Sequence, residues 1–213
     1  MFYYKLMILA GVSFMAQFVL IRYFKHAKLF QKIYELSPQQ HQKKGATPSF
    51  GGIGILLSCW VGYFLFSFSL KMLWVMAVFS LFSLLGLYDD VLALIKKRNQ
   101  GLTTSQKFGL QVIFAAGLLQ VYSVYIEPLS WWMIVFACFV LVGTSNATNL
   151  TDGLDGLLAG CSFITILGVG FIARRYLFYD INLFCVVVLI ALFGFYFFNR
   201  HPAKIFMGDT GSL

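Results

Sequence analysis

The chain has 213 residues, of which 60% are hydrophobic and 11% are charged. Soluble domains carry roughly 25% charged residues, so this composition excludes an ordinary water-soluble domain and indicates a membrane protein. The net charge of +8 would also suit a protein that binds nucleic acid. Basic loops beside membrane helices account for the same excess, and we therefore expect contacts with membrane lipids and none with nucleic acid.

Seven apolar segments are long enough to be membrane-spanning helices. A helix needs roughly 20 apolar residues to cross a hydrocarbon core about 30 Å thick. Barrel strands would alternate polar and apolar residues, which these segments do not. The sequence therefore predicts an all-α, polytopic membrane protein with one transmembrane domain over residues 1–213. The expected spans are 6–23, 51–70, 72–88, 108–126, 129–145, 156–173 and 181–198.

Basic residues divide unequally between the two sets of loops that alternating helices create. One set holds Arg22, Lys25, Lys28, Lys32, Lys43, Lys44, Lys96, Lys97, Arg98, Lys107, Arg200 and Lys204. The other set holds only Lys5, Lys71, Arg174 and Arg175. Because Lys and Arg are enriched in cytoplasmic loops, the first set is expected in the cytoplasm and the N-terminus outside.

Five of the eight acidic residues lie in three motifs on the expected cytoplasmic side, GLYDDVLAL (86–94), NLTDGLDGL (149–157) and IFMGDTGSL (205–213). Ionisable groups at membrane depth are costly unless paired or hydrated, and such groups mark functional sites. Oxygen ligands suit Mg²⁺ or Mn²⁺, and Mg²⁺ usually bridges to a substrate phosphate. The motifs together predict a metal-dependent phosphate site. Its acids are Asp89, Asp90, Asp152, Asp155 and Asp209.

Each acidic motif also has a purely structural interpretation. Asp89 and Asp90 would fit the polar end of a helix, although carboxylates there oppose the helix dipole. Asp152 would fit a helix N-cap, and Asp209 an ordinary surface turn between glycines. The occurrence of three such motifs on one side of the membrane favours the functional interpretation.

Two basic loops on the same side are candidates for binding phosphate. The loop SPQQHQKKGATPSFGG (37–52) contributes Lys43, Lys44 and Thr47, and KKRNQGLTTSQK (96–107) contributes Lys107. Both loops are equally compatible with simple anchoring to anionic headgroups. Phe206, close to Asp209, would either stack on a nucleobase or pack against lipid.

Five stretches resemble the polyprenyl-phosphate N-acetylhexosamine-1-phosphate transferases, in the family's order. They are HQKKGATPSFGG, GLYDDVLAL, KRNQGLTTSQKFGLQ, GTSNATNLTDGLDGLLAG and NRHPAKIFMGDTGSL, and they extend from about residue 41 to residue 213. Within the family, the KRNQGLTTSQK and NLTDGLDGL stretches are most similar to the branch that transfers phospho-N-acetylmuramoyl-pentapeptide. The form ATPSFGG departs slightly from the usual pattern of that branch.

The resemblance implies a reaction, a cofactor and partners. The family transfers a phospho-sugar from a UDP-linked donor to undecaprenyl phosphate, releases UMP and requires Mg²⁺. Here the donor would be UDP-linked N-acetylmuramoyl-pentapeptide, and the product the first lipid-linked peptidoglycan precursor. The implied location is the bacterial inner membrane, with the site on the cytoplasmic face and direct attack by the lipid phosphate. A second copy of the chain is a candidate partner in a homodimer.

Matched by motif position, the family's functional residues fall on twelve positions of this chain. The resemblance implies metal binding by Asp209, with Asn149 as second contributor. The candidate catalytic residues are Asp89, as the acid that deprotonates the lipid phosphate, its neighbour Asp90, and Asp152, which also matches a position that lines the nucleotide site. The candidate substrate-binding residues are Lys43, Lys44, Thr47 and Lys107 near the diphosphate, and Asn149, Asp155, Asn199 and Phe206 near the nucleotide.

Three other interpretations remain open at this point. A transferase that uses UDP-GlcNAc shares most of these motifs. The family normally has ten spanning helices and a histidine-rich loop, so a chain that reaches only Leu213 is expected to be incomplete at its C-terminus, or inactive. A transporter with an acidic ion path is less favoured, because transporters carry polar residues through helix centres.

Overall fold

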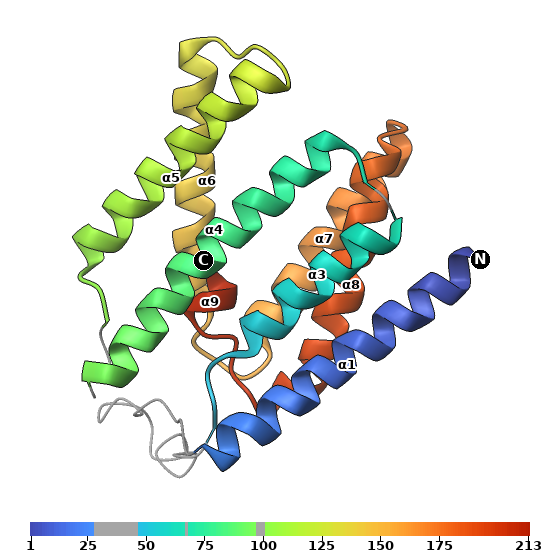
Figure 1. Cartoon of the computed structure of the whole chain (residues 1–213), viewed down its shortest axis with the longest axis vertical. Coiled ribbons are helices and arrows are strands. Elements are labelled where there is room, and N and C mark those ends of the chain that lie inside the picture. The colour runs from blue at the N-terminus through green and yellow to red at the C-terminus, as the bar shows by residue number, and fades with distance from the viewer. Residues whose placement is uncertain (28–46, 67, 97–100) are drawn as a thin grey trace.

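The computed structural model describes residues 1–27, 47–66, 68–96 and 101–213, and every element in these ranges is helical (Figure 1). The all-α prediction is therefore confirmed. The helices are α1 (Phe2–His26), α3 (Gly51–Phe66), α4 (Leu70–Lys96), α5 (Thr104–Tyr125), α6 (Trp131–Thr151), α7 (Leu157–Arg175), α8 (Tyr179–Asn199) and the short α9 (Asp209–Ser212).

Six of the described helices, α1 and α4 to α8, are long and apolar enough to cross a membrane, as a multi-pass membrane protein requires. The remaining expected span corresponds to α3, which has 16 residues and reaches about 24 Å. This is shorter than the hydrocarbon core of about 30 Å. The count of seven spans and the outward N-terminus therefore stay predictions.

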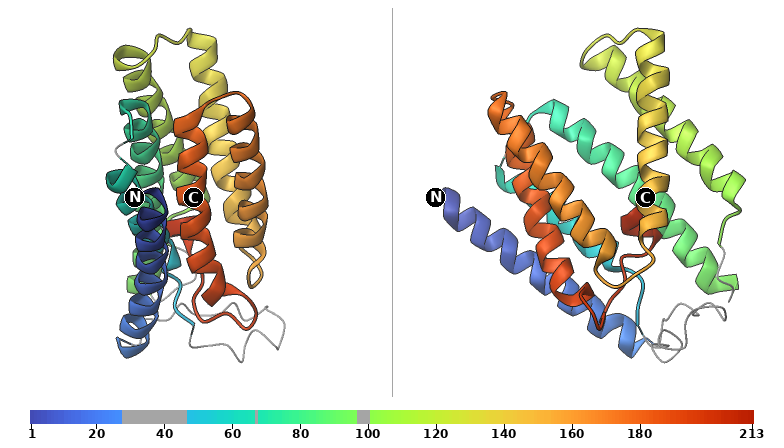
Figure 2. Two further views of the ribbon diagram at one scale, coloured as in Figure 1. Left: turned by 90° about the vertical axis from the view of Figure 1, so that its right-hand side faces the viewer. Right: turned by 180° about the vertical axis from the view of Figure 1, so that it is seen from behind.

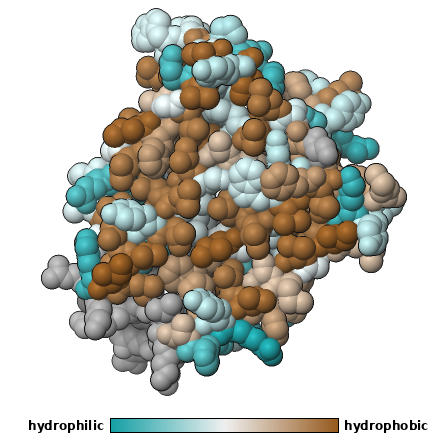
Figure 3. Space-filling view, viewed as in Figure 1, coloured by the Kyte–Doolittle hydropathy of each residue, from teal (hydrophilic) through white to brown (hydrophobic). Residues whose placement is uncertain are grey.

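The long helices form two layers, with α1, α3, α4 and α5 in one and α6, α7 and α8 in the other (Figure 2). The α7–α8 hairpin packs against α1 and α3, while α5 and α6 form a second hairpin, and α4 contacts both groups. Apolar side chains cover most of the face seen in Figure 3, and hydrophilic ones lie at its edges, as expected for a surface in contact with lipid.

Apolar packing and a few buried hydrogen bonds hold the helices together. One core surrounds Phe195 and Met76, which are fully buried, and a second joins Phe82, Ala115 and Val142 of α4, α5 and α6. Without water, polar side chains in a membrane protein must find partners within the protein. The fully buried Gln17 of α1, for example, donates to the carbonyl of Gly51 at the start of α3 (3.0 Å).

Two helices extend further than the sequence predicts. The helix α4 continues to Lys96 instead of ending near Tyr88, and α6 continues to Thr151 instead of Ser145. Polar residues are kept inside these helices by partners on other elements. Asn146 of α6, for instance, donates to the side-chain oxygen of Gln111 on α5 (2.7 Å). Such long-range partners cannot be read from local apolarity.

The short helix α9 lies against the side of α4, between the two layers (Figure 1). Gly86 permits this contact, because a Cβ atom at that position would lie 1.9 Å from the carbonyl oxygen of Asp209. The absence of a side chain at one position of α4 thus lets the end of α4 approach the backbone that carries Asp209.

Replacement of Gly86 by alanine is expected to destabilise the protein by about 1–3 kcal/mol, the usual cost of overpacking. Gly117→Ala is the matched control, since it also lies inside a helix but has no atom within 4 Å of the added Cβ. That control should be neutral, or stabilising by up to about 1 kcal/mol through helix propensity. Thermal unfolding in detergent measures both, and equal melting temperatures would contradict the close packing of α4 and α9.

Candidate active site

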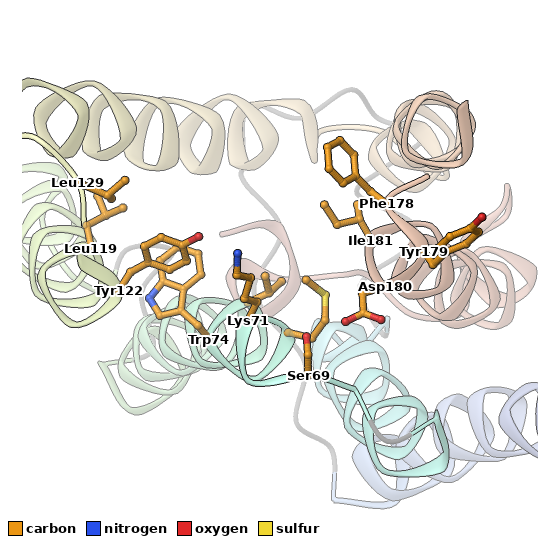
Figure 4. A pocket seen from close by; sticks show the side chains of 12 residues that line it. Ser69, Lys71, Trp74, Leu119, Tyr122, Leu129, Phe178, Tyr179, Asp180 and Ile181 are labelled. Atoms are coloured by element: carbon orange, nitrogen blue, oxygen red, sulfur yellow. The ribbon is translucent and has the colours of Figure 1, made fainter. Parts of the chain in front are cut away.

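A cavity of about 650 Å³ lies at the start of α4, at the opposite end of that helix from Asp89 and Asp90 (Figure 4). It is lined mainly by apolar and aromatic residues, among them Trp74, Leu119 and Phe178. Lys71 in its wall forms an ion pair with Glu127 (3.0 Å). No residue of the three acidic motifs lines it, so the candidate phosphate site must be elsewhere.

The first part of that site is the corner between α4 and α5. A capping box starts α5, in which the hydroxyl of Thr103 accepts from the amide of Gln106 and the Gln106 side chain accepts from the amide of Thr103. This start places Lys107 in the first turn of α5, facing α4. The Lys107 ammonium lies 2.9 Å from Asp89, whose other oxygen accepts from the amide of Leu102 (2.5 Å).

The second part is Asp209, which lies between α4, α5 and α6. One oxygen of Asp209 accepts from Lys107, so this lysine joins the carboxylates of Asp89 and Asp209. The other oxygen accepts from the side-chain amide of Asn149 on α6 (2.8 Å), which also donates to Ser212 (2.8 Å). Three segments that are far apart in the sequence therefore converge on the Asp209 carboxylate.

Asp90 contacts the same segment on its backbone side. Its carboxylate accepts from the amide of Asp209 (3.3 Å), the amide of Thr210 (3.0 Å) and the hydroxyl of Thr210 (2.7 Å). Asp90 is 2% exposed and Asp89 is 7% exposed, so both carboxylates of α4 are enclosed within the protein.

The segment before α9 is held against the segment before α3. The amide of Phe206 donates to the carbonyl of Pro48 (2.8 Å), and the amide of Gly51 donates to the carbonyl of Phe206 (2.9 Å). Gly208 follows with φ +72°, and a Cβ there would lie 2.3 Å from the carbonyl oxygen of Ser49. Only glycine fits this left-handed, crowded position without strain, and the turn directs Asp209 towards Lys107.

The loop between α6 and α7 is fixed to the segment after α8. Asn199 accepts from the amide of Gly156 (3.0 Å) and donates to the carbonyl of Ile205 (2.9 Å). One oxygen of Asp155 accepts from the amide of Ala203 (3.1 Å) and lies 3.0 Å from the ring of His201. Asp155 and Asn199 thus connect the two loops and set the position of Phe206.

A polar cavity of about 240 Å³ lies between these parts. It is lined by Ser49, Asn149, Asp152, Gly153, Leu154, Asp155, Phe206, Gly208 and Asp209. Burial, with the charge of Asp209 as a smaller cause, raises the pKa of the Asp152 carboxyl from 3.8 to about 6. Burial and a hydrogen bond with Asp89 also raise the pKa of Asp209, while Lys107 and Asn149 oppose the rise. A cation or a donor of protons is therefore favoured in this cavity.

The residues around the polar cavity fit a magnesium ion that also contacts substrate. Asp209 and Asn149 both line the cavity and carry a carboxylate and a side-chain amide, whose oxygens are ligand types that Mg²⁺ prefers. No group of three or more His, Cys, Asp or Glu side chains suited to a metal occurs among the described residues. Mg²⁺ usually takes only one or two carboxylates from a protein and completes its coordination with water and substrate phosphates.

Comparison with known proteins agrees with this arrangement. The family model for glycosyl transferase family 4 matches residues 72–213, the region that contributes all three acidic motifs. The chain belongs to this family.

Individual members of the family resemble the chain over nearly its whole length. A phospho-N-acetylmuramoyl-pentapeptide-transferase of Geobacillus kaustophilus is 40% identical over 230 residues, covering 98% of this chain and 71% of the relative. A protein of the same name from Bacillus subtilis is 39% identical, covering 95% of this chain and 68% of the relative. One from Geobacillus thermodenitrificans is 41% identical, covering 98% of this chain and 71% of the relative.

Most residues that the sequence singles out as site candidates lie close together in the structure. Asp89, Lys107, Asn149 and Asp209 form one connected set, and Asp90 holds the backbone of the same segment. The polar cavity is lined by Asp152, Asp155 and Phe206, together with Asn149 and Asp209.

Two of the remaining candidates, Asn199 and Thr47, are not among the described residues that line the polar cavity. Asn199 is buried behind it, where it holds two loops. Thr47 directly precedes Pro48, which pairs with Phe206. Lys43 and Lys44 lie outside the described residues.

Sequence reasoning missed four residues that support the site. Thr148 donates to the carbonyl of Ser212 (2.6 Å), Ser212 accepts from Asn149, Thr210 donates to Asp90, and His201 contacts Asp155. Thr210 and Ser212 lie in the motif GDTGS, so their position beside Asp209 was the available signal. Thr148 and His201 also lie in stretches that resemble the family, but their partners Ser212 and Asp155 are far along the chain and cannot be identified from local sequence.

The raised pKa of Asp152 makes a prediction about stability and pH. Because the folded-state pKa of about 6 is above the ordinary 3.8, the folded state binds this proton more tightly. The contribution of the Asp152 proton to the stability of the folded state is complete below pH 3.8 and is lost as the pH rises through about 6. Asp152→Asn should therefore melt like the unchanged protein near pH 4 and at a higher temperature at pH 7.

The size of this effect is limited by the access of water to the cavity. A rise from 3.8 to about 6 corresponds to at most ~3 kcal/mol. We expect about 1 kcal/mol, or roughly 2–4 °C, in detergent with a metal chelator present. Asp180→Asn at the opposite end of the bundle is the control for the loss of a carboxylate outside the cavity. A pH-independent difference for Asp152→Asn would contradict the prediction.

Proposed function

We propose that the chain is a magnesium-dependent glycosyl-1-phosphate transferase. It transfers phospho-N-acetylmuramoyl-pentapeptide from a UDP-linked donor to undecaprenyl phosphate and releases UMP. The product is the first lipid-linked precursor of peptidoglycan. The observation that carries the proposal is the convergence of Asp89, Lys107, Asn149 and Asp209 beside a polar cavity, in a chain about 40% identical to relatives of that name.

The reaction exchanges one phosphoanhydride (P–O–P) bond for another. An oxygen of the lipid phosphate attacks the phosphorus that carries the sugar, and the bond from that phosphorus to the UMP oxygen breaks. Phosphoryl transfer of this kind needs positioning and charge neutralisation more than covalent chemistry by the protein. The residues around the polar cavity supply these two contributions, and a direct, one-step attack is sufficient.

Charge neutralisation falls to one lysine and to the metal-binding pair. Asp209 and Asn149 are the residues that would hold Mg²⁺, which when bound offsets the negative charge that builds up on departing UMP. Lys107 places an ammonium group at the same carboxylate, and so within reach of the diphosphate. Asp89, on the other side of Lys107, is positioned to take any proton that the lipid phosphate retains.

Recognition of the nucleotide falls to the other wall of the polar cavity. Phe206 lines this cavity and offers an aromatic face on which a base can stack. Asp152 and Asp155 offer carboxylate oxygens that accept from the N–H and O–H groups of a nucleoside. Asn199 acts indirectly, since its bonds to Gly156 and Ile205 set the distance between the two loops.

The location of the site explains how a lipid and a soluble nucleotide can meet. The acidic motifs lie at the ends of apolar helices, where a lipid phosphate can stay at the level of the headgroups. Basic residues at the same helix ends, such as Lys25, Lys96 and Lys204, place this end in the cytoplasm by the positive-inside rule. We therefore assign the protein to the bacterial inner membrane, with the polar cavity on the cytoplasmic face.

The direct test is the release of UMP in detergent, with undecaprenyl phosphate, Mg²⁺ and UDP-N-acetylmuramoyl-pentapeptide. Asp209→Asn should lower the rate by at least about 100-fold, because it removes a charged ligand and the partner of Lys107. Glu127→Gln, whose partner Lys71 is at the opposite end of the bundle, is the control and should keep the rate within about twofold. Equal activity of the two variants would refute the assigned site.

The choice of donor is tested in the same assay. The family model also covers transferases that act on UDP-GlcNAc, so both donors should be supplied in parallel. Turnover of the pentapeptide donor alone would support the proposal. Turnover of UDP-GlcNAc alone would show that the same site acts on UDP-GlcNAc instead.

A further inference from the structure

Asp90 has a different environment from its neighbour Asp89, although both side chains belong to one turn of α4. Asp89 contacts a lysine, the kind of partner that exchanges with a charged substrate. Within the described part of the chain, the Asp90 carboxylate accepts three hydrogen bonds, all from Asp209 and Thr210. Two of the donors are backbone amides, which cannot move without moving Asp209.

These contacts fix Asp209 from behind. The amide of Asp209 and the amide and hydroxyl of Thr210 donate to Asp90, while the carboxylate of Asp209 turns the other way, towards Lys107 and Asn149. Gly208 permits the close approach of this segment to Asp90, because a Cβ on it would lie 2.8 Å from the Asp90 carboxylate. The direction of the Asp209 side chain is thus set by bonds that Asp90 makes to its backbone.

We infer that Asp90 is a positioning residue, which holds the backbone of residues 209–210 so that the Asp209 carboxylate is aimed into the polar cavity. This inference rests on the proposed function and deepens it. A role as catalytic base is disfavoured by geometry, because Asp90 is 2% exposed and both of its oxygens accept hydrogen bonds from Asp209 or Thr210. Groups that orient a metal ligand usually change metal affinity or activity by about 10–100-fold when removed.

The test is metal binding to the full chain in detergent, without any substrate. Mn²⁺ is the probe, because its free concentration can be followed by electron paramagnetic resonance. Asp90→Asn keeps the shape of the side chain but loses an acceptor oxygen, and it should weaken Mn²⁺ binding by about 10–100-fold. Unfolding of part of the sample would lower the number of sites but not their affinity. An unchanged Mn²⁺ affinity would overturn the inference.

Thr210 provides a matched pair of variants for the same contact. Thr210→Val has nearly the same volume but cannot donate to Asp90, and should weaken Mn²⁺ binding by about 3–10-fold. Thr210→Ser retains the hydroxyl and should stay within twofold. The effects of Asp90→Asn and Thr210→Val should be less than multiplicative in the double variant, since they remove one shared interaction. Fully multiplicative effects would show that Asp90 does not act through Thr210.

Kinetics separate positioning from base catalysis. A positioning role predicts that Asp90→Asn raises the Mg²⁺ concentration for half-maximal rate about as much as it weakens Mn²⁺ binding, with the pH profile of kcat unchanged. Loss of a base would instead lower kcat at saturating Mg²⁺ and remove the acidic limb of that profile. If the unchanged chain binds Mn²⁺ and the variants weaken binding as expected, but no UDP-sugar is consumed, the proposed function fails while the positioning role stands.

Discussion

The burial of negative charge at a membrane boundary is the constraint on which the rest of this structure depends. Carboxylates that are removed from water must be neutralised or hydrogen-bonded, since an unpaired buried charge costs several kcal/mol. The chain meets this requirement in two ways. Lys107 lies between Asp89 and Asp209, and backbone amides surround Asp90. These contacts join α4, α5 and α9 at the site.

The two solutions divide the acids into a chemical group and a structural group. Asp209 and Asp152 face the polar cavity, where burial raises the pKa of each carboxyl. A bound cation or a proton donor is therefore favoured there. Asp90 faces the backbone, and one oxygen of Asp155 holds the loop after α8. Some aspartates therefore face the cavity and others hold the backbone in place. The direction of each side chain decides which of these two roles it has.

Sequence reasoning predicted the helical class and the grouping of the three acidic motifs, because apolar length and charge placement are local properties. It missed the ends of α4 and α6, since Asp89, Asp90 and Asn149 stay helical through partners more than ten residues away. It did not predict that Asn199 bonds to Gly156 and Ile205 and so connects two loops beside the cavity. Side-chain direction depends on packing between distant segments, which local composition does not specify.

The bond from Gln17 to the carbonyl of Gly51 links the site to a helix that precedes the matched family region. Gly51 and Gly52 in turn pair with the carbonyls of Phe206 and Met207, which directly precede the turn at Gly208. The first helix is thus mechanically part of the catalytic framework. A chimera that takes α1 from a relative would have to carry an amide donor at this position, or its active-site turn would lose a distant anchor.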